Sequence, residues 1–230
     1  MIEIIPAILP LDYNDVIGHL EAVKSATKLV QIDICDGEFT PRKTWPFVGD
    51  RGEFKKMLDE GLPFWQELDY EVDLMVADQL NEAKQWISLG AKRIIFHWEA
   101  GGVKEAIEEI KKNFFYEKDN DVLELGVAIN LETDIEELKS VIDDINFVQC
   151  MGIVQIGYQG QSFDERTFKK IEAIRKTYPQ VKISVDGGVS LKNAQELAKD
   201  GAERLVIGSA IFQTEVEPIE ALRKIKEVLN

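Results

Sequence analysis

Short apolar runs alternate with amphipathic segments along the chain, and this pair repeats about every 25–30 residues, as in βα units. The apolar runs are rich in Val and Ile and end at Gly, Pro or Asp, which is typical of strands buried on both faces of a parallel sheet. They predict strands at Ile2–Leu9, Leu29–Cys35, Tyr70–Val76, Arg93–Trp98, Leu123–Asn130, Phe147–Val154, Val181–Val185 and Arg204–Ile207.

The segments between these runs predict helices, because their apolar residues recur at helical spacing. Asp12 and Ser190 are expected as N-caps of the first and seventh helices. The stretch Phe114–Asp121 is expected to extend the fourth helix or to form a surface loop. The predicted helices are Tyr13–Ser25, Phe54–Glu60, Gln79–Leu89, Val103–Asn113, Ile135–Ile145, Glu165–Thr177, Ser190–Lys199 and Pro218–Leu229.

Eight strands that alternate with eight helices predict a single α/β domain over residues 1–230. Right-handed βα crossovers repeated eight times close into a (β/α)8 barrel, the TIM barrel. An open doubly wound sheet is the alternative, but no G-x-G-x-x-G follows the first strand.

Composition narrows the possible partners. The 230 residues are 45% hydrophobic and 30% charged, with a formal net charge of −15. An acidic chain without a basic stripe argues against nucleic acid or an anionic membrane as partner. The apolar N-terminus lacks a basic flank, no run reaches the roughly 18 residues of a membrane span, and Cys35 and Cys150 fit reduced core positions. A cytoplasmic protein is expected.

The last two strands are each followed by a glycine turn. Val181–Phe212 reads as strand, Asp186-Gly187-Gly188, helix, strand and Gly208-Ser209. Such turns expose backbone N–H groups at one end of a parallel sheet, where they can hold a phosphate without Lys or Arg. In (β/α)8 barrels the loops after strands seven and eight often bind phosphate. Two structural turns without a ligand are the alternative.

Polar residues lie at strand positions that a barrel would otherwise fill with apolar side chains. Period-two alternation places Gln31, Asp33 and Cys35 on one face of the second strand. Gln31 and the carboxylates of Asp33, Asp73 and Asp186 are expected to converge at the barrel mouth. A hard divalent cation there would offset the repulsion among the three carboxylates. Capping of loop N–H groups is the alternative, and a lone histidine such as His97 is more often a hydrogen-bonded core residue than a ligand.

At these residues the chain resembles the ribulose-phosphate 3-epimerase family over nearly its whole length. The stretches that carry the resemblance are Ile32–Pro41, Asp73–Val76, Phe96–Ala100, Gly126–Thr133, Gly157–Phe163, Val185–Val189 and Gly208–Phe212. The last two also occur in other phosphate-binding barrels, whereas IDICDGEFTP and the Gly157–Phe163 loop are more particular to the epimerases.

The resemblance implies a D-ribulose 5-phosphate 3-epimerase, an isomerase acting on a phosphorylated sugar. Asp33 and Asp186 would be the two acid–base residues, one removing the C3 proton and the other protonating the opposite face, with a divalent metal between them. Phosphate would be bound at Gly157, Gly160, Gly187, Gly188, Gly208 and Ser209, and the substrate would be lined by Ala7, Cys35, Met75, His97 and Met151. A homo-oligomer is expected.

The chain departs from the family at the metal. The family holds its metal with two aspartates and two histidines, and the histidine positions are Gln31 and Asp73 here. Ala7 and Cys35 also replace a serine and a methionine. An amide and an added carboxylate make a harder, more anionic site, so a site of Gln31, Asp33, Asp73 and Asp186 is expected to prefer Mg²⁺ or Mn²⁺ over Zn²⁺ or Fe²⁺. The alternative for Gln31 is a hydrogen bond to a metal-bound water, with the three aspartates as ligands. A barrel acting on another phosphorylated compound, or a non-catalytic binder, is the alternative function.

Overall fold

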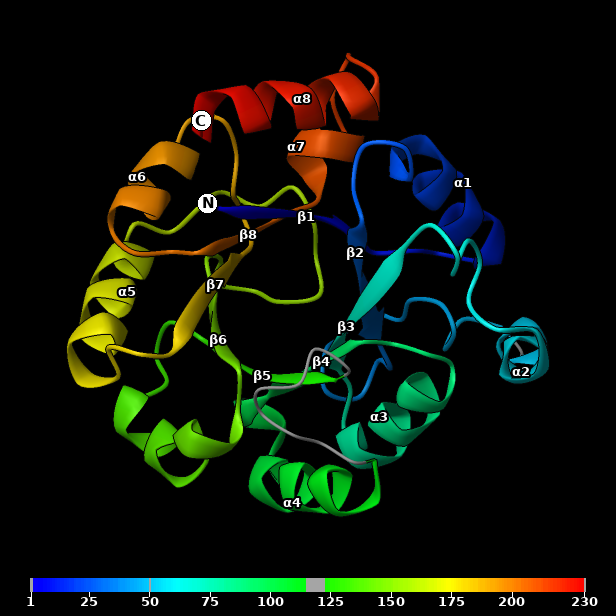
Figure 1. The fold of residues 1–230 in the computed structure, drawn as a ribbon, viewed down its shortest axis with the longest axis horizontal. Coiled ribbons are helices and arrows are strands. Elements are labelled where there is room, and N and C mark those ends of the chain that lie inside the picture. Colours follow the sequence, from blue (N-terminus) through cyan, green and yellow to red (C-terminus); the bar gives the residue numbers. More distant parts are fainter. Residues whose placement is uncertain (1, 50, 115–122, 230) are drawn as a thin grey trace.

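The protein is described here from a computed structural model that places residues 2–49, 51–114 and 123–229. Over these residues eight parallel strands close into a barrel in chain order, with β8 pairing back to β1 (Figure 1). This confirms the predicted (β/α)8 barrel and excludes the open sheet. The strands are β1 (Glu3–Ile8), β2 (Leu29–Cys35), β3 (Asp69–Met75), β4 (Arg93–His97), β5 (Glu124–Ile129), β6 (Phe147–Met151), β7 (Lys182–Asp186) and β8 (Arg204–Ile207).

Helices surround the barrel on its outside (Figure 1). Asp12 caps the first of them as predicted, because its side chain accepts a hydrogen bond from the Asp15 N–H at 2.9 Å. The helices are α1 (Tyr13–Val23), α2 (Gly52–Glu60), α3 (Gln79–Ser88), α4 (Val103–Asn113), α5 (Arg166–Thr177), α6 (Ala194–Lys199), α7 (Ser209–Phe212) and α8 (Pro218–Leu229), with 3-10 helices η1 (Trp98–Ala100), η2 (Ile135–Ser140) and η3 (Ile142–Asp144). None of the helices in the described ranges combines the length and apolar character that a membrane span requires.

The two faces of each strand belong to different layers. In β2, Val30, Ile32 and Ile34 are fully buried in the main apolar core with helix residues such as Leu20. The alternate residues of the same strand face the barrel interior. The interior is therefore where the polar strand residues meet, and the apolar face of each strand is covered by helices.

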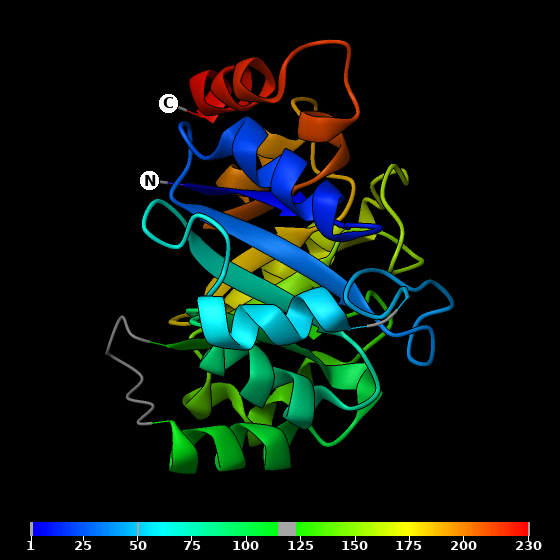
Figure 2. The same cartoon turned by 90° about the vertical axis from the view of Figure 1, so that its right-hand side faces the viewer.

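The loops after β2 and β6 extend from the same end of the barrel. In Figure 2 the strands run from the side that carries both termini toward the opposite side, where these two loops lie. This end holds the carboxyl ends of the strands, where (β/α)8 barrels place their active sites. It is called the mouth below.

The segment between β5 and β6 differs from the prediction. An α-helix was predicted over Ile135–Ile145, whereas the structure has two 3-10 helices, η2 and η3. Ile135, Leu138 and Val141 recur every third residue, and Leu138 and Val141 are buried. A spacing of three matches the 3.0 residues per turn of a 3-10 helix better than the 3.6 of an α-helix.

Other predicted boundaries also shift. α6 begins after Asn193 and not directly after Ser190, although the Ser190 hydroxyl does accept a hydrogen bond from the Lys192 N–H at 3.3 Å. The Asn193 side chain accepts from the Ser190 N–H at 2.8 Å and donates to the Gly188 carbonyl at 3.0 Å. β6 ends at Met151 and not at Val154. The Gly152 N–H makes the last bond of its ladder with β7, to the Asp186 carbonyl at 2.6 Å, and β7 ends at Asp186. The short helix α7 was not predicted. Residues 115–121 of the predicted extension lie outside the described residues.

Candidate active site

Three carboxylates meet inside the barrel at its mouth. Asp33 and Asp73 lie opposite each other on β2 and β3, and Asp186 ends β7. One oxygen from each lies within 4.8 Å of the others. These residues, called the acidic cluster below, are brought together as the strand alternation predicted. The repulsion among three carboxylates must be offset by donors, protons or a cation.

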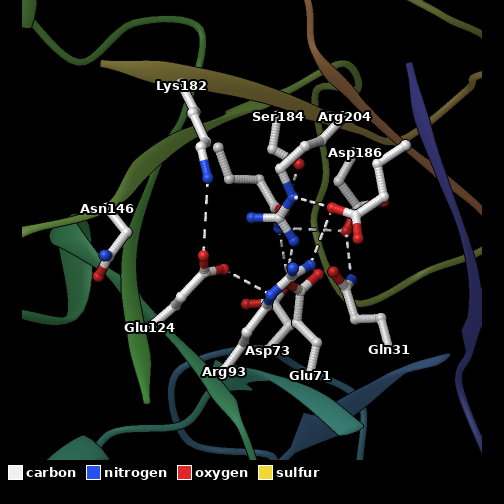
Figure 3. Close-up of polar contacts among 12 residues, drawn as sticks. Gln31, Glu71, Asp73, Arg93, Glu124, Asn146, Lys182, Ser184, Asp186 and Arg204 are labelled. Atoms are coloured by element: carbon white, nitrogen blue, oxygen red, sulfur yellow. Dashed lines mark hydrogen bonds and ion pairs between the residues drawn. The ribbon is translucent and has the colours of Figure 1, made fainter. Parts of the chain in front are cut away.

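Two buried amides donate to the acidic cluster. The Gln31 Nε2 donates to Asp33 Oδ1 and to Asp186 Oδ2, both at 2.7 Å. Figure 3 shows the contact between Gln31 and Asp186. The Gln149 Nε2 lies farther away, at 3.4 Å from Asp73 Oδ2 and 3.3 Å from Asp186 Oδ2. The Ser184 hydroxyl in turn donates to Gln149 Oε1 at 3.2 Å. The cluster is therefore bridged by neutral donors from β2 and β6.

His97 compensates charge beside the acidic cluster. It is fully buried, and its Nε2 lies 2.8 Å from Asp73 Oδ1. Burial alone would lower the pKa of this imidazole, but the contact with Asp73 outweighs burial and raises the pKa above its usual value. A raised pKa favours the imidazolium form, which carries a positive charge next to Asp73.

Burial and crowding also raise the pKa values of Asp33 and Asp186. Burial raises the pKa of Asp33 well above its usual value, and the carboxylates of Asp186 and Asp73 add to the shift, against the hydrogen bond from Gln31. Burial and then Asp73 raise the pKa of Asp186 to about 7, again opposed by Gln31. Two neighbouring acids with raised pKa values can differ in protonation near neutral pH, as a pair of acid–base groups requires.

These shifts predict that stability depends on pH. Asp186 has a usual pKa of 3.8 and a pKa of about 7 in the folded chain. At pH values between these two, the folded state keeps a proton that the unfolded state has released. The stabilisation of the folded state by this proton is therefore full below the lower value and is lost as pH rises through the higher one. In the presence of a metal chelator, urea titration should give a lower free energy of unfolding at about pH 8 than at about pH 5. The Asp186→Asn variant should lose less free energy of unfolding over this pH interval than the wild type does. A loss equal to that of the wild type would contradict the assignment of the raised pKa to Asp186.

A cavity of about 40 Å³ opens above the acidic cluster. No Lys or Arg is present among the described residues that line it. All six residues predicted for phosphate line it, as do Ala7, Met75 and Met151. The full lining is Ala7, Leu9, Asp33, Met75, Met151, Ile153, Gly157, Tyr158, Gln159, Gly160, Gln161, Asp186, Gly187, Gly188, Val189, Val206, Gly208 and Ser209.

Cys35 and His97, which were expected to line the substrate, lie deeper. Both side chains are fully buried and neither belongs to the cavity lining. The Cys35 Sγ lies 4.0 Å from the Met75 Sδ, and burial raises the pKa of its thiol to about 12. Cys35 therefore packs against Met75 and does not line the cavity. Burial also raises the pKa of Cys150, again to about 12, in keeping with a reduced core thiol.

The glycines at the mouth adopt conformations that other residues rarely reach. Gly187 and Gly188 have φ of 102° and 68°. A Cβ at Gly188 would lie 2.6 Å from the Phe163 Cα, so close packing of the β6 loop also requires glycine there. Within the described chain no residue accepts a hydrogen bond from the backbone N–H of Gly188 or Ser209. These N–H groups are free to bind an anion in the cavity.

The sequence prediction missed a charged layer one step below the acidic cluster. The Arg204 Nη2 donates to Glu71 Oε2 inside the barrel, and both residues are buried (Figure 3). The Arg204 guanidinium also lies 3.7 Å from the centre of the Phe147 ring. Glu71 precedes Asp73 by two residues, so the alternation that identified Asp73 could have identified Glu71 as well. Gln159, which has glycines on both sides of its loop, was also missed among the lining residues.

A closed parallel barrel with polar residues and glycine loops at the carboxyl ends of its strands has the organisation typical of (β/α)8-barrel enzymes. The profile described as "Ribulose-phosphate 3 epimerase family" matches residues 3–212. The chain belongs to this family. It is 30% identical to ribulose-phosphate 3-epimerase from Schizosaccharomyces pombe, over 96% of this chain and 92% of the relative. It is 29% identical to ribulose-phosphate 3-epimerase from Escherichia coli K12, over 91% and 88%.

Solved structures share the fold at lower identity. The 3-hexulose-6-phosphate synthase from Salmonella typhimurium superposes with a TM-score of 0.71 at 14% identity, covering 99% of this chain and 98% of that one. A structure of KGPDC from Streptococcus mutans also gives 0.71, at 15% identity, covering 99% and 97%. At these identities the likeness shows the barrel fold alone.

Proposed function

We propose that the protein is a sugar-phosphate epimerase that inverts C3 of D-ribulose 5-phosphate. The observation that carries this proposal is the pair Asp33 and Asp186, which reach one cavity from β2 and β7. Both have raised pKa values. Family membership supports the choice of reaction and of substrate.

The proposed reaction uses the two aspartates in turn. The C3 proton lies next to the C2 carbonyl, so its removal by one carboxylate leaves an enediolate. The other aspartate, in its protonated form, then returns a proton to the opposite face, which inverts the centre. In the cation-free structure, the Gln31 amide donates to both of these side chains and links them beside the cavity. Because the roles exchange in the reverse reaction, a shared proton near neutral pH suits both directions.

The donor set fits a hard divalent cation. The three carboxylates of the acidic cluster offer oxygens within 4.8 Å of one another, and Gln31 adds an amide beside them. His97 offers no free nitrogen toward the cluster, since its Nε2 contacts Asp73. An all-oxygen set favours Mg²⁺ or Mn²⁺ over Zn²⁺ or Fe²⁺. A cation bound there would stabilise negative charge on the substrate oxygens.

The phosphate would bind at the glycine loops on the other side of the cavity. Gly157, Gly160, Gly187, Gly188, Gly208 and Ser209 line this side. The free N–H groups after β7 and β8 point to recognition by backbone dipoles, because the described lining has no Lys or Arg. The proposed substrate is therefore oriented with its phosphate at β7 and β8 and its C3 between the aspartates.

Two substitutions at Ser209 test the phosphate assignment. Ser209→Asp places a carboxylate where the phosphate is proposed to bind, and like-charge repulsion in a partly buried cavity should weaken phosphate-ester affinity by about tenfold or more. Ser209→Ala keeps the backbone N–H and should change affinity by less than about threefold. Calorimetry with a non-reacting phosphate ester measures both. Equal affinity in the Ser209→Asp variant and the wild type would place the phosphate elsewhere.

Incubation with ribulose 5-phosphate in D₂O tests the reaction itself, with Mg²⁺, Mn²⁺ or Zn²⁺ added separately. Xylulose 5-phosphate with deuterium at C3 is expected, and faster turnover with Mg²⁺ or Mn²⁺ than with Zn²⁺. Binding of the phosphate ester without exchange at C3 would support the alternative function, a barrel that binds another phosphorylated compound.

A further inference from the structure

The two buried amides beside the acidic cluster are held in different ways. The Gln149 Nε2 faces the cluster, and its Oε1 accepts from the Ser184 hydroxyl at 3.2 Å. Turning this amide over would bring an oxygen toward carboxylates, and the Ser184 hydroxyl would have to accept a hydrogen bond where it now donates one. Both ends of the Gln149 amide are therefore hydrogen-bonded in the present orientation.

Gln31 is held from one end only. Its Nε2 makes both short contacts, at 2.7 Å to Asp33 and 2.7 Å to Asp186, while its buried Oε1 has no hydrogen-bond partner among the described residues. The side chain is fully buried, so solvent does not satisfy the oxygen. A buried acceptor without a partner is unfavourable, and the only bonds that fix the amide are those to the two carboxylates.

A cation in the acidic cluster would reverse the preferred orientation. The carboxylate oxygens that now accept from Gln31 would turn to the cation, and an N–H dipole pointing at a positive charge is repulsive. A half-turn of the amide exchanges Oε1 and Nε2, costs no hydrogen bond at Oε1, and presents an oxygen of the kind that Mg²⁺ and Mn²⁺ prefer.

We propose that Gln31 is a cation-responsive ligand. In the cation-free protein its N–H groups hold Asp33 and Asp186 together. When a divalent cation binds the acidic cluster, the amide turns over and its Oε1 becomes a ligand. This inference rests on the cation site of the proposed function. It assigns two alternating roles to Gln31 and not to Gln149, whose Oε1 is already hydrogen-bonded and whose Nε2 lies farther from the carboxylates.

Titration of the full-length, cation-free protein with Mn²⁺ by calorimetry tests the inference. Gln31→Leu removes the amide oxygen and should weaken Mn²⁺ binding by about tenfold or more. The matched control, Gln149→Leu, removes an amide that keeps its nitrogen toward the cluster and should change the affinity far less. If Gln31→Leu bound Mn²⁺ as tightly as the wild type or more tightly, the N–H would be competing with the cation and the inference would be wrong.

A second measurement does not depend on the variants remaining folded alike. In ¹⁵N-labelled wild-type protein, the side-chain amide signals of Gln31 should shift strongly on addition of diamagnetic Mg²⁺, while those of Gln149 should stay closer to their positions. An unmoved Gln31 amide at saturating Mg²⁺ would overturn the inference.

The outcomes separate this inference from the proposed function. An active epimerase in which Gln31→Leu leaves Mn²⁺ affinity unchanged refutes the inference alone. A protein that binds Mn²⁺ through Gln31 but exchanges no deuterium at C3 refutes the epimerase and supports the inference. Absence of Mn²⁺ binding to the wild type refutes both the inference and the cation site.

Discussion

Replacement of Asp33 or Asp186 by asparagine is expected to lower turnover of ribulose 5-phosphate by at least about 10²–10⁴-fold, the usual contribution of a general acid or base. An amide cannot take up or deliver the C3 proton, and each substitution also removes one carboxylate from the acidic cluster. Steady-state kinetics in both directions of the reaction measures the loss for each variant.

Both asparagine variants should remain folded, because each removes a crowded carboxylate whose pKa burial has already raised. Circular dichroism and urea titration check this point. Asp59→Asn, on the exposed face of α2, is the matched control and should retain full turnover. Near-normal activity in either variant at the acidic cluster would refute the two-base assignment.

The second large effect is expected at the barrel interior, where Arg204→Met should destabilise the protein by about 3–5 kcal/mol. Arg204 donates to Glu71, and both side chains are buried. Burial already raises the pKa of Glu71, and the nearby Arg204 opposes that shift. Without Arg204, Glu71 would remain as a buried charge without its closest partner, or would take up a proton.

A double-mutant cycle distinguishes loss of the ion pair from loss of packing. Adding Glu71→Met to Arg204→Met removes the stranded carboxylate and should recover much of the stability, since an apolar pair of similar volume can replace a buried ion pair. Arg223→Met breaks exposed pairs with Glu220 and Glu227 on α8 and should lower the free energy of unfolding far less than Arg204→Met. If Arg204→Met cost as little as Arg223→Met, the interior pair would not be a stabilising element.

Local sequence patterns predicted most of the fold. Each strand is a short β-branched run with turn residues at its ends, and the parallel barrel follows from eight repeats of one βα unit. The errors fell where a pattern permits two local structures. Between β5 and β6 an α-helix was predicted over Ile135–Ile145. The structure has 3-10 helices there, which match the three-residue spacing of Ile135, Leu138 and Val141.

The candidate site could be predicted as far as strand alternation reaches. Asp33, Asp73 and Asp186 were expected to meet because they occupy inward positions near the carboxyl ends of their strands, and they do. The hydrogen bonds that Gln31 and Gln149 donate to these aspartates could not be predicted, because most of them join residues far apart in sequence. Gln31 and Asp186 are 155 positions apart. Alternation also places Cys35 on the inward face without giving its depth, so its position against Met75 appeared only in the structure.

The sequence by itself determined the barrel, the inward direction of the carboxylates and the glycine turns after β7 and β8. All three depend on local geometry: strand periodicity, turn conformation and the handedness of βα crossovers. Only the tertiary structure decided which donors satisfy those carboxylates. Gln149 is hydrogen-bonded to Ser184, whereas Gln31 bridges two acids and its own oxygen has no partner among the described residues. Such pairings depend on barrel closure, which brings β2, β6 and β7 within hydrogen-bond distance, and no local pattern encodes that distance.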